Sequence, residues 1–177
     1  KKYNPLFESK ARYFIITGGR GSGKSFAVTV FLTLLTMSRG IRVLFTRFTM
    51  TSAHLSIIPE FLEKIGLLGF DETFNINKSE VVNAKNKSDI LFRGIKTSAG
   101  NQTASLKSLQ GISTWVLDEA EELVDENIFD TIDLSIREKK VQNRIILVLN
   151  PVTKEHWIYK RFFEDKGVEG GFNGVKD

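Results

Sequence analysis

A glycine-rich turn between two apolar segments constrains the fold of this chain more than any other feature. Residues Gly18 to Ser25 read Gly-Gly-Arg-Gly-Ser-Gly-Lys-Ser, which satisfies the G-x-x-x-x-G-K-S/T pattern of a phosphate-binding P-loop. The apolar run Tyr13 to Ile16 precedes the turn, and Phe26 to Val28 follows it. A strand, a turn and the start of a helix therefore come in the order that a P-loop requires. A glycine-rich turn that matched the pattern by chance would not need a strand before it or a helix after it.

Each part of the turn has a chemical role in holding a nucleotide. Glycines let backbone N–H groups converge on phosphate oxygens, and the helix N-terminus adds a partial positive charge there. Lys24 can reach the β- and γ-phosphates, and the Ser25 hydroxyl can hold Mg²⁺. The expected nucleotide contacts are Gly19, Arg20, Gly21, Ser22, Gly23, Lys24 and Ser25.

The composition is that of an ordinary globular domain and excludes several other classes. With 177 residues, of which 41% are hydrophobic and 26% charged, the chain can bury a sizeable core. It has no cysteine, hence no disulfide framework, and no apolar run approaches the ~18 residues of a membrane span. The formal charge of +4 permits contact with nucleic acid without requiring it. The chain opens without Met or a signal-peptide pattern, so we expect a trimmed fragment.

Strand and helix patterns alternate over residues 1–166, which we expect to be one domain. The strands are continuous apolar runs, as in a parallel sheet that helices cover on both faces. The glycine-rich residues 167–177 are expected to be a loose tail or the start of a linker. The expected strands are 12–17, 41–46, 73–76, 80–84, 89–93, 113–117 and 144–149. The expected helices are 24–38, 52–65, one that begins at Asp125, and 155–164, with a loop or short helix over 96–108.

Two consecutive carboxylates follow the apolar strand 113–117. Asp118 is placed to hold the hydration shell of a magnesium ion, and Glu119 to orient and polarise the attacking water. The simpler interpretation is that the two acids only form a solvated strand end. Their position downstream of a P-loop favours the roles in metal binding and water activation. Glu121 and Glu122 continue the acidic run, and for them we expect an exposed helix face.

The order of these motifs narrows the class of P-loop protein. At least one strand, 41–46, lies between Ser25 and Asp118 in the sequence, and a glutamate follows the aspartate. This combination indicates the RecA-like group of ATPases and argues against nucleotide kinases and GTPases. We therefore expect an α/β fold, a RecA-like additional-strand P-loop NTPase with a mostly parallel central sheet and helices on both faces.

A third polar site follows the strand 144–149. Asn150 can contact the attacking water or the γ-phosphate there, and so report hydrolysis to the segment that follows. The alternative is that Asn150-Pro151 only ends the strand.

Several cations are candidates for a role in hydrolysis. Arg20 occupies a P-loop position where small residues are usual; it can switch between the γ-phosphate and Glu119, or it can be an exposed loop arginine. Hydrolysis in this class often needs an arginine finger, which accelerates it by about 10³–10⁵. The candidate fingers are Arg47, Arg93 and Lys107.

The histidines and most aromatic residues are expected to be structural. His54 and His156 lack acidic or cysteine companions at ligand spacing, so we expect no histidine metal site. Trp115 is expected in the core. A core position or a docking surface for a following domain is expected for Trp157, Tyr159, Phe162 and Phe163.

Taken together, these residues resemble the ATPase domain of a tailed-phage terminase large subunit, the DNA-packaging motor. The arginine within the P-loop is the most family-like detail, since an unrelated P-loop ATPase would share only the two Walker motifs. The resemblance extends nearly end to end, over Asn4-Pro5, Gly18 to Ser25, Arg47, Phe92-Arg93-Gly94, Lys107-Ser108, Trp115 to Ala120, Asn150-Pro151, His156-Trp157 and Arg161-Phe162-Phe163.

The resemblance implies a role for the residues of the phosphate site, with ATP and Mg²⁺ as cofactors. Lys24 and Ser25 match the Walker-A pair, so Lys24 contributes to catalysis and Ser25 to metal binding. Asp118 matches the Walker-B aspartate that holds the metal. Glu119 matches the catalytic glutamate.

The resemblance also implies roles outside that centre. Asn150 matches the motif that couples hydrolysis to DNA movement, and Arg20 matches the P-loop arginine proposed to sense ATP. Adenine contacts in the family come partly from the segment before the P-loop, where Asn4 and Arg12 are the nearest matches.

The implied partners are double-stranded DNA, the portal protein and the small terminase subunit, with no membrane. The implied assembly is a homo-oligomeric ring during packaging, in the cytoplasm of the infected bacterial host, in which a neighbouring subunit can supply the arginine finger. In isolation the chain is expected to be a monomer. Family members carry a second, nuclease domain, and we assign no nuclease residues to this chain.

Two other functions stay open at this point. One is a different RecA-like DNA-dependent ATPase, of the helicase or recombination type. The other is a nucleotide-gated assembly module in which turnover is incidental, although such a module does not need the water-activating Glu119.

Overall fold

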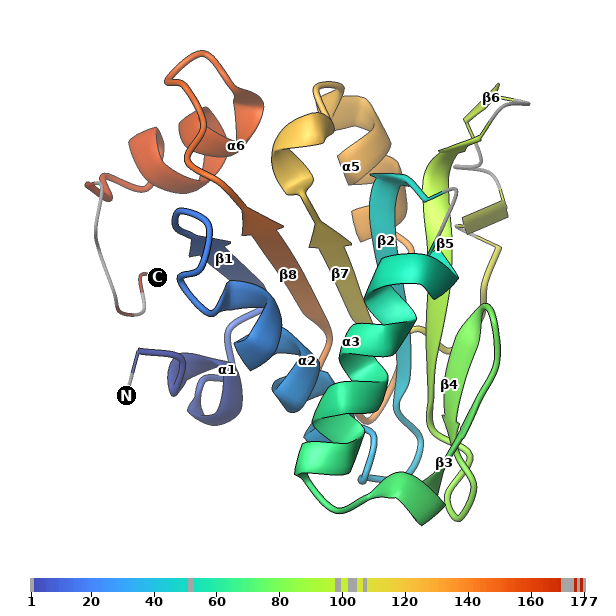
Figure 1. Cartoon of the computed structure of the whole chain (residues 1–177). Coiled ribbons are helices and arrows are strands. Elements are labelled where there is room, and N and C mark those ends of the chain that lie inside the picture. Colours follow the sequence, from blue (N-terminus) through green and yellow to red (C-terminus); the bar gives the residue numbers. More distant parts are fainter. Residues whose placement is uncertain are drawn as a thin grey trace.

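The computed structural model describes residues 2–50, 53–97, 100–101, 105–106, 108–169, 174 and 176, and its centre is one eight-stranded sheet (Figure 1). The strands are β1 (Tyr13–Thr17), β2 (Arg42–Thr49), β3 (Phe74–Ile76), β4 (Glu80–Asn83), β5 (Asp89–Thr97), β6 (Gly100–Asn101), β7 (Thr114–Asp118) and β8 (Arg144–Leu149). The α-helices are α1 (Pro5–Glu8), α2 (Lys24–Leu35), α3 (Ala53–Leu67), α5 (Glu126–Asp133) and α6 (Trp157–Tyr159). Short helical turns are η1 (Asp71–Thr73), η2 (Ala120–Glu122) and the π-helical η3 (Lys160–Glu164).

The sheet is mostly parallel, as the sequence predicts. Its strand order is β1-β8-β7-β2-β5-β4-β3, and β6 pairs with β5 beside that path. The five strands from β1 to β5 in this order run parallel to one another. The hairpin of β3 and β4 adds antiparallel strands at one edge, because its connection is too short for a parallel crossover.

The additional strand lies in a place that the sequence order does not reveal. It is β8 that pairs with both β1 and β7, and so separates the strand before the P-loop from the strand that ends in Asp118. The strand 41–46, which lies between the two motifs in the sequence, is part of β2 and pairs with the other side of β7. Position along the chain does not fix position in a sheet, so a strand between two motifs in the sequence does not have to lie between them in the sheet.

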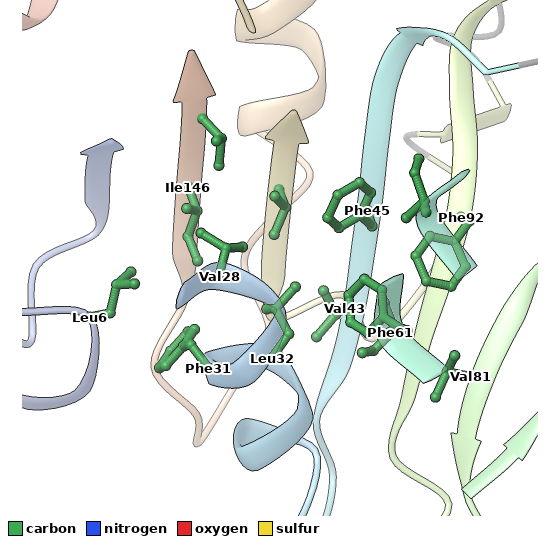
Figure 2. Close-up of a cluster of buried hydrophobic side chains, with 14 of the residues drawn as sticks. Leu6, Val28, Phe31, Leu32, Val43, Phe45, Phe61, Val81, Phe92 and Ile146 are labelled. Carbon is green, nitrogen blue, oxygen red and sulfur yellow. The ribbon is translucent and has the colours of Figure 1, made fainter. Parts of the chain in front are cut away.

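Side chains that alternate along the strands build two cores, one on each face of the sheet. On one face, α2 and α3 pack against Val43, Phe45, Phe92 and Ile146, and Figure 2 shows this layer. The helical partners in that view include Val28, Phe31, Leu32 and Phe61. On the other face the core is formed by residues that include Leu44, Trp115, Leu117, Phe129, Ile132, Leu147, Trp157 and Ile158.

The two-sided burial explains why the central strands are continuous apolar runs. Every residue of β7 is buried, and so are five successive residues of β8. Trp115 is fully buried, as predicted, and its indole N–H donates to the hydroxyl of Thr46 at 2.8 Å. Trp157 is buried as well, and Phe162 packs against it with ring centroids 6.3 Å apart. Trp115 and Trp157 are thus core residues, whereas Phe162 and Phe163 are only partly buried against the same core.

Several element boundaries differ from the sequence prediction. The strand expected over 41–46 continues to Thr49, so Arg47 lies inside β2. The strand expected over 89–93 continues to Thr97 and pairs with β6, within a stretch expected to be loop or helix. Helix α1 was not predicted, since four residues give no periodicity. The tail from 167 lies largely outside the described residues. Within the described part of the chain, no helix combines the length and the apolar character needed to cross a bilayer.

Candidate nucleotide-binding site

A cavity opens at the carboxyl ends of β1, β7 and β8, where open α/β sheets bind their ligands. The volume of the cavity is about 400 Å³, which is within the usual range for ligand sites. One side is formed by residues 20–26 of the P-loop and the start of α2. Strands β2, β7 and β8 and the residues that follow β7 and β8 provide the rest of the lining, which is Arg47, Asp118, Glu119, Glu121, Val148, Leu149 and Asn150. The structure therefore brings Lys24, Asp118 and Glu119 to one cavity.

The P-loop adopts a backbone that only glycine tolerates well. Gly21 has φ +72° and Gly23 has φ +80°, both in the left-handed region, and Gly23 is the N-cap of α2. A Cβ atom on Gly18 would lie 3.0 Å from the Ser22 hydroxyl oxygen. The Tyr3 hydroxyl donates to the carbonyl of Ser22 at 2.8 Å and ties the N-terminal segment to the loop.

Lys24 lies across the mouth of the loop and is held by oxygen acceptors. Its Nζ donates to the carbonyls of Gly18 and Gly19, the latter at 3.0 Å, and contacts Asn150 Oδ1 at 3.4 Å. The ammonium group of Lys24 thus donates to protein oxygens at the place where a bound nucleotide would offer phosphate oxygens. Lys24 therefore links the P-loop to the end of β8.

Asn150 continues this link to the turn after β7. Its Nδ2 donates to Glu121 Oε1 at 2.6 Å, and the His156 Nε2 lies 3.2 Å from the carbonyl oxygen of Glu121. The expectation of an exposed face for Glu121 was wrong, because η2 turns this residue back toward β8, where it is half-buried and lines the cavity. Glu122 is exposed, as predicted.

Arg47 pairs with both acids at the end of β7. Its Nε and Nη2 donate to Asp118 Oδ2 at 2.8 and 2.7 Å, and Nη1 lies 3.7 Å from Glu119 Oε1. The Asp118 carboxylate is almost completely buried, so the guanidinium compensates a charge that has lost its hydration. Strands β2 and β7 are neighbours, which places these residues together.

The other candidate fingers lie elsewhere. The Arg93 Nη1 donates to the carbonyls of Ser79 at 3.3 Å and Phe92 at 2.7 Å, and Arg93 does not line the cavity. Lys107 lies outside the described residues. Arg20 is exposed and lines the cavity, with no hydrogen bond or ion pair to another described residue.

The two residues expected near adenine are not part of the cavity lining. Arg12 donates to Asp133 Oδ1 at 2.6 Å and to the carbonyl of Ile136 at 3.1 Å, at the end of β1 opposite the P-loop. Its assignment to the nucleotide is therefore contradicted by its position, because β1 separates the two. Asn4 donates to Glu8 Oε1 at 3.4 Å along α1. Tyr3 is the N-terminal residue that contacts the loop.

Glu119 has an unusual backbone conformation. With φ 53° and ψ 44° it lies in the left-handed region, which is costly for a residue with a Cβ atom. Burial raises the pKa of Glu119, as do Asp118 and two further acids, while Arg47 opposes the increase. A strained carboxylate with a raised pKa is common where a structure serves chemistry.

We expect Glu119→Gly to raise the free energy of unfolding by about 1 kcal/mol, because glycine adopts a positive φ without the Cβ clash. For a chain of this size the gain corresponds to about 2–4 °C in melting temperature, which circular dichroism measures. Glu119→Ala is the control, since it removes the carboxylate but retains Cβ. Equal melting temperatures for the two variants would contradict the strain argument.

The residues present fit a magnesium ion that arrives with phosphates. The Ser25 and Asp118 side chains offer a hydroxyl and a carboxylate, the hard oxygen ligands that Mg²⁺ prefers, and both residues line the cavity. Among the described residues, no group of three or more His, Cys, Asp or Glu side chains gathers to hold a metal unaided. Mg²⁺ sites with one or two carboxylates plus substrate phosphates need no such group.

A P-loop after β1, an acid pair at the end of β7 and the strand β8 inserted between β1 and β7 define an additional-strand P-loop NTPase. The chain belongs to the phage terminase large subunit family, whose family model matches residues 10–172. No curated protein matches the sequence.

Solved structures of terminases share the fold. A large terminase from a thermophilic bacteriophage superposes with a TM-score of 0.71 at 14% identity, over 94% of this chain and 42% of that one. The N-terminal domain of the bacteriophage phi29 DNA packaging ATPase gives 0.67 at 18% identity, over 90% and 84%. The Thermus phage P74-26 large terminase ATPase domain gives 0.65 at 21% identity, over 97% and 72%. The chain thus spans less than half of the thermophilic phage's terminase.

Proposed function

We propose that this chain is an ATP-hydrolysing motor domain that powers translocation of double-stranded viral DNA into a procapsid. The observation that carries the proposal is the convergence of Lys24, Asp118 and Glu119 on one cavity at the sheet's carboxyl edge. Family membership supports it, and the large terminase of the thermophilic bacteriophage has been solved in complex with ADP and with ATP-gamma-S. A phi29 neighbour is described as a viral genome packaging motor assembly.

Each side chain has a task in this proposal. Lys24 exchanges the carbonyls of the loop for β- and γ-phosphate oxygens, and Glu119 accepts a hydrogen bond from a water and orients it against the γ-phosphate. Bound Mg²⁺, held by Ser25 and Asp118, would neutralise phosphate charge. Arg20, exposed in the loop, is free to approach the γ-phosphate as a sensor.

Asn150 is the residue through which nucleotide state reaches the rest of the domain. It contacts Lys24 through Oδ1 and Glu121 through Nδ2, and Glu121 is in turn adjacent to His156, the N-cap of α6. When Lys24 binds phosphate, Asn150 loses its contact with Lys24. Asn150 can then move relative to Glu121, and through Glu121 and His156 this movement reaches α6. This path supports the coupling role over a simple strand end.

The proposed partners are duplex DNA, the portal protein and the small terminase subunit, in a homo-oligomeric ring that acts in the cytoplasm of the infected host. A nuclease domain in the parent protein would cut the DNA. These partners follow from family membership, and the fold alone does not supply them.

We expect the purified chain to release phosphate from ATP in the presence of Mg²⁺, and duplex DNA at low salt to accelerate this release. Because phosphate contacts release counterions, the acceleration should decline steeply as salt is raised. A coupled phosphate-release assay measures both effects.

Phosphate release, an unwinding assay and a measurement of oligomeric state together separate the alternatives. A helicase would prefer single-stranded DNA and would separate strands in an unwinding assay. An assembly module would oligomerise equally well with ATP and with a non-hydrolysable analogue, and DNA would not change its turnover. Failure to bind ATP at all would contradict the motor assignment.

A further inference from the structure

Helix α3 places a carboxylate behind the phosphate site. A second, small cavity adjoins the first, and Ser25 and Asp118 line both of them. The polar residues around the small cavity are Ser25, Thr29, Glu60 and Asp118. About 10 Å³ of it is open to the centres of water molecules, which is about the space of one water.

Glu60 is a charged residue that lies beside apolar, buried residues of α3. Its neighbours Ile57 and Phe61 are at most 3% exposed and pack in the core between α3 and the sheet. Glu60 itself is only half-buried, and burial raises its pKa because the charged form loses hydration. A carboxylate at such a position is costly unless it has a partner.

The described residues do not provide that partner directly. The two cations that act on Glu60 are Lys64 and Arg47. Lys64 pairs with Glu63 at 2.8 Å, and Arg47 donates to Asp118. Within the described part of the chain, no group forms a hydrogen bond or ion pair with the Glu60 carboxylate. The cavity that it shares with Ser25 and Asp118 has about the space of one water, which can donate a hydrogen bond to this carboxylate.

We propose that Glu60 is a positioning residue that accepts a hydrogen bond from a water in the shell of the Mg²⁺ held by Ser25 and Asp118. Mg²⁺ keeps several of its waters in such sites, and each needs an acceptor on its outer side. Groups that orient the ligands of a metal are worth about 10–100-fold in its affinity. The proposal rests on the proposed function and names one more residue of that site.

The test compares Glu60→Gln with the wild-type chain by calorimetric titration of ADP, with and without Mg²⁺. We expect the ratio of the two ADP affinities, which is the gain from Mg²⁺, to fall about tenfold in the variant. The affinity for ADP without metal should be unchanged, since Glu60 contacts the metal's water and not the nucleotide.

Glu63→Gln is the matched control. Glu63 is the more exposed acid of the same helix and pairs with Lys64, so its loss changes the helix charge equally without touching the small cavity. We expect a wild-type gain from Mg²⁺ in this variant. An equal loss in both variants, or a full gain in Glu60→Gln, would overturn the proposal.

Two further outcomes are also informative. If Glu60→Gln does not fold, Glu60→Asp keeps the charge but withdraws it by one methylene, and an undiminished gain from Mg²⁺ in that variant would overturn the proposal. If the wild-type chain binds ADP equally with and without Mg²⁺, the proposed function itself fails and the role of Glu60 falls with it.

Discussion

Replacement of Glu119 by glutamine is expected to slow ATP hydrolysis by about 10²–10⁴-fold, the usual contribution of a positioned acid–base group. Glutamine keeps the shape and the left-handed backbone of Glu119 but cannot polarise water as a carboxylate does. Single-turnover phosphate release measures the loss. Affinity for a non-hydrolysable ATP analogue should stay close to wild type, because Lys24 and the P-loop are untouched and the contact of Glu119 with Arg47 is a long one of 3.7 Å.

The pH dependence adds a second criterion to this experiment. Burial raises the pKa of Glu119, so on acidification the carboxylate gains its proton earlier than an ordinary glutamate. Wild-type hydrolysis should decline over that range, and the residual rate of Glu119→Gln should not. Glu122→Gln, at an exposed neighbouring acid, is the control and should resemble wild type. Undiminished turnover in Glu119→Gln would remove Glu119 from the mechanism.

The local features of this site were predictable because each has a local cause. The P-loop needs glycines at fixed spacing, and Gly21 and Gly23 indeed have positive φ. The buried strands needed two apolar faces, which their uninterrupted sequences display. Asp118 and Glu119 had to lie at the sheet's carboxyl edge once their strand was parallel to β1.

The pairings between distant segments were not predictable. Nothing local shows that β8 inserts beside β1, and this insertion is what brings Asn150 to Lys24 and Glu121. The acidic run gave no reason to separate Glu121 from Glu122, because the η2 turn that separates them depends on tertiary packing. Arg47 was one of three equal candidates until β2 paired with β7.

Residues were also missed because their signal is weak in a single sequence. Tyr3 lies in an N-terminal segment with no periodicity, yet its hydroxyl reaches Ser22. Glu60 lies in the helix expected over 52–65, and a polar residue there resembles any helix-surface acid. Only the packing of α3 against the sheet shows that Glu60 shares a cavity with Asp118.

Replacement of Arg47 by alanine is expected to lower ATP hydrolysis by about 10³-fold or more, the range found for arginine fingers. Arg47 is the finger candidate that the structure brings to the acids, and it belongs to the same chain as they do. Alanine also leaves the buried Asp118 without its counter-charge, which destabilises the fold. Arg47→Lys separates the two effects: the ammonium keeps the charge, so the melting temperature should recover, but it lacks the planar donor fork, so the rate should not.

Mixing variants shows from which subunit the arginine acts. Arg47→Ala retains Glu119, and Glu119→Gln retains Arg47. If Arg47 acts within its own chain, no site in a mixture of the two variants contains both groups, and hydrolysis stays at the level of the separate variants. Restored hydrolysis in the mixture would show instead that Arg47 serves a neighbour's nucleotide. Arg93→Ala tests a second candidate, which lies outside the cavity of its own chain: a loss as large as that of Arg47→Ala, at an unchanged melting temperature, would indicate a finger supplied by a neighbouring subunit.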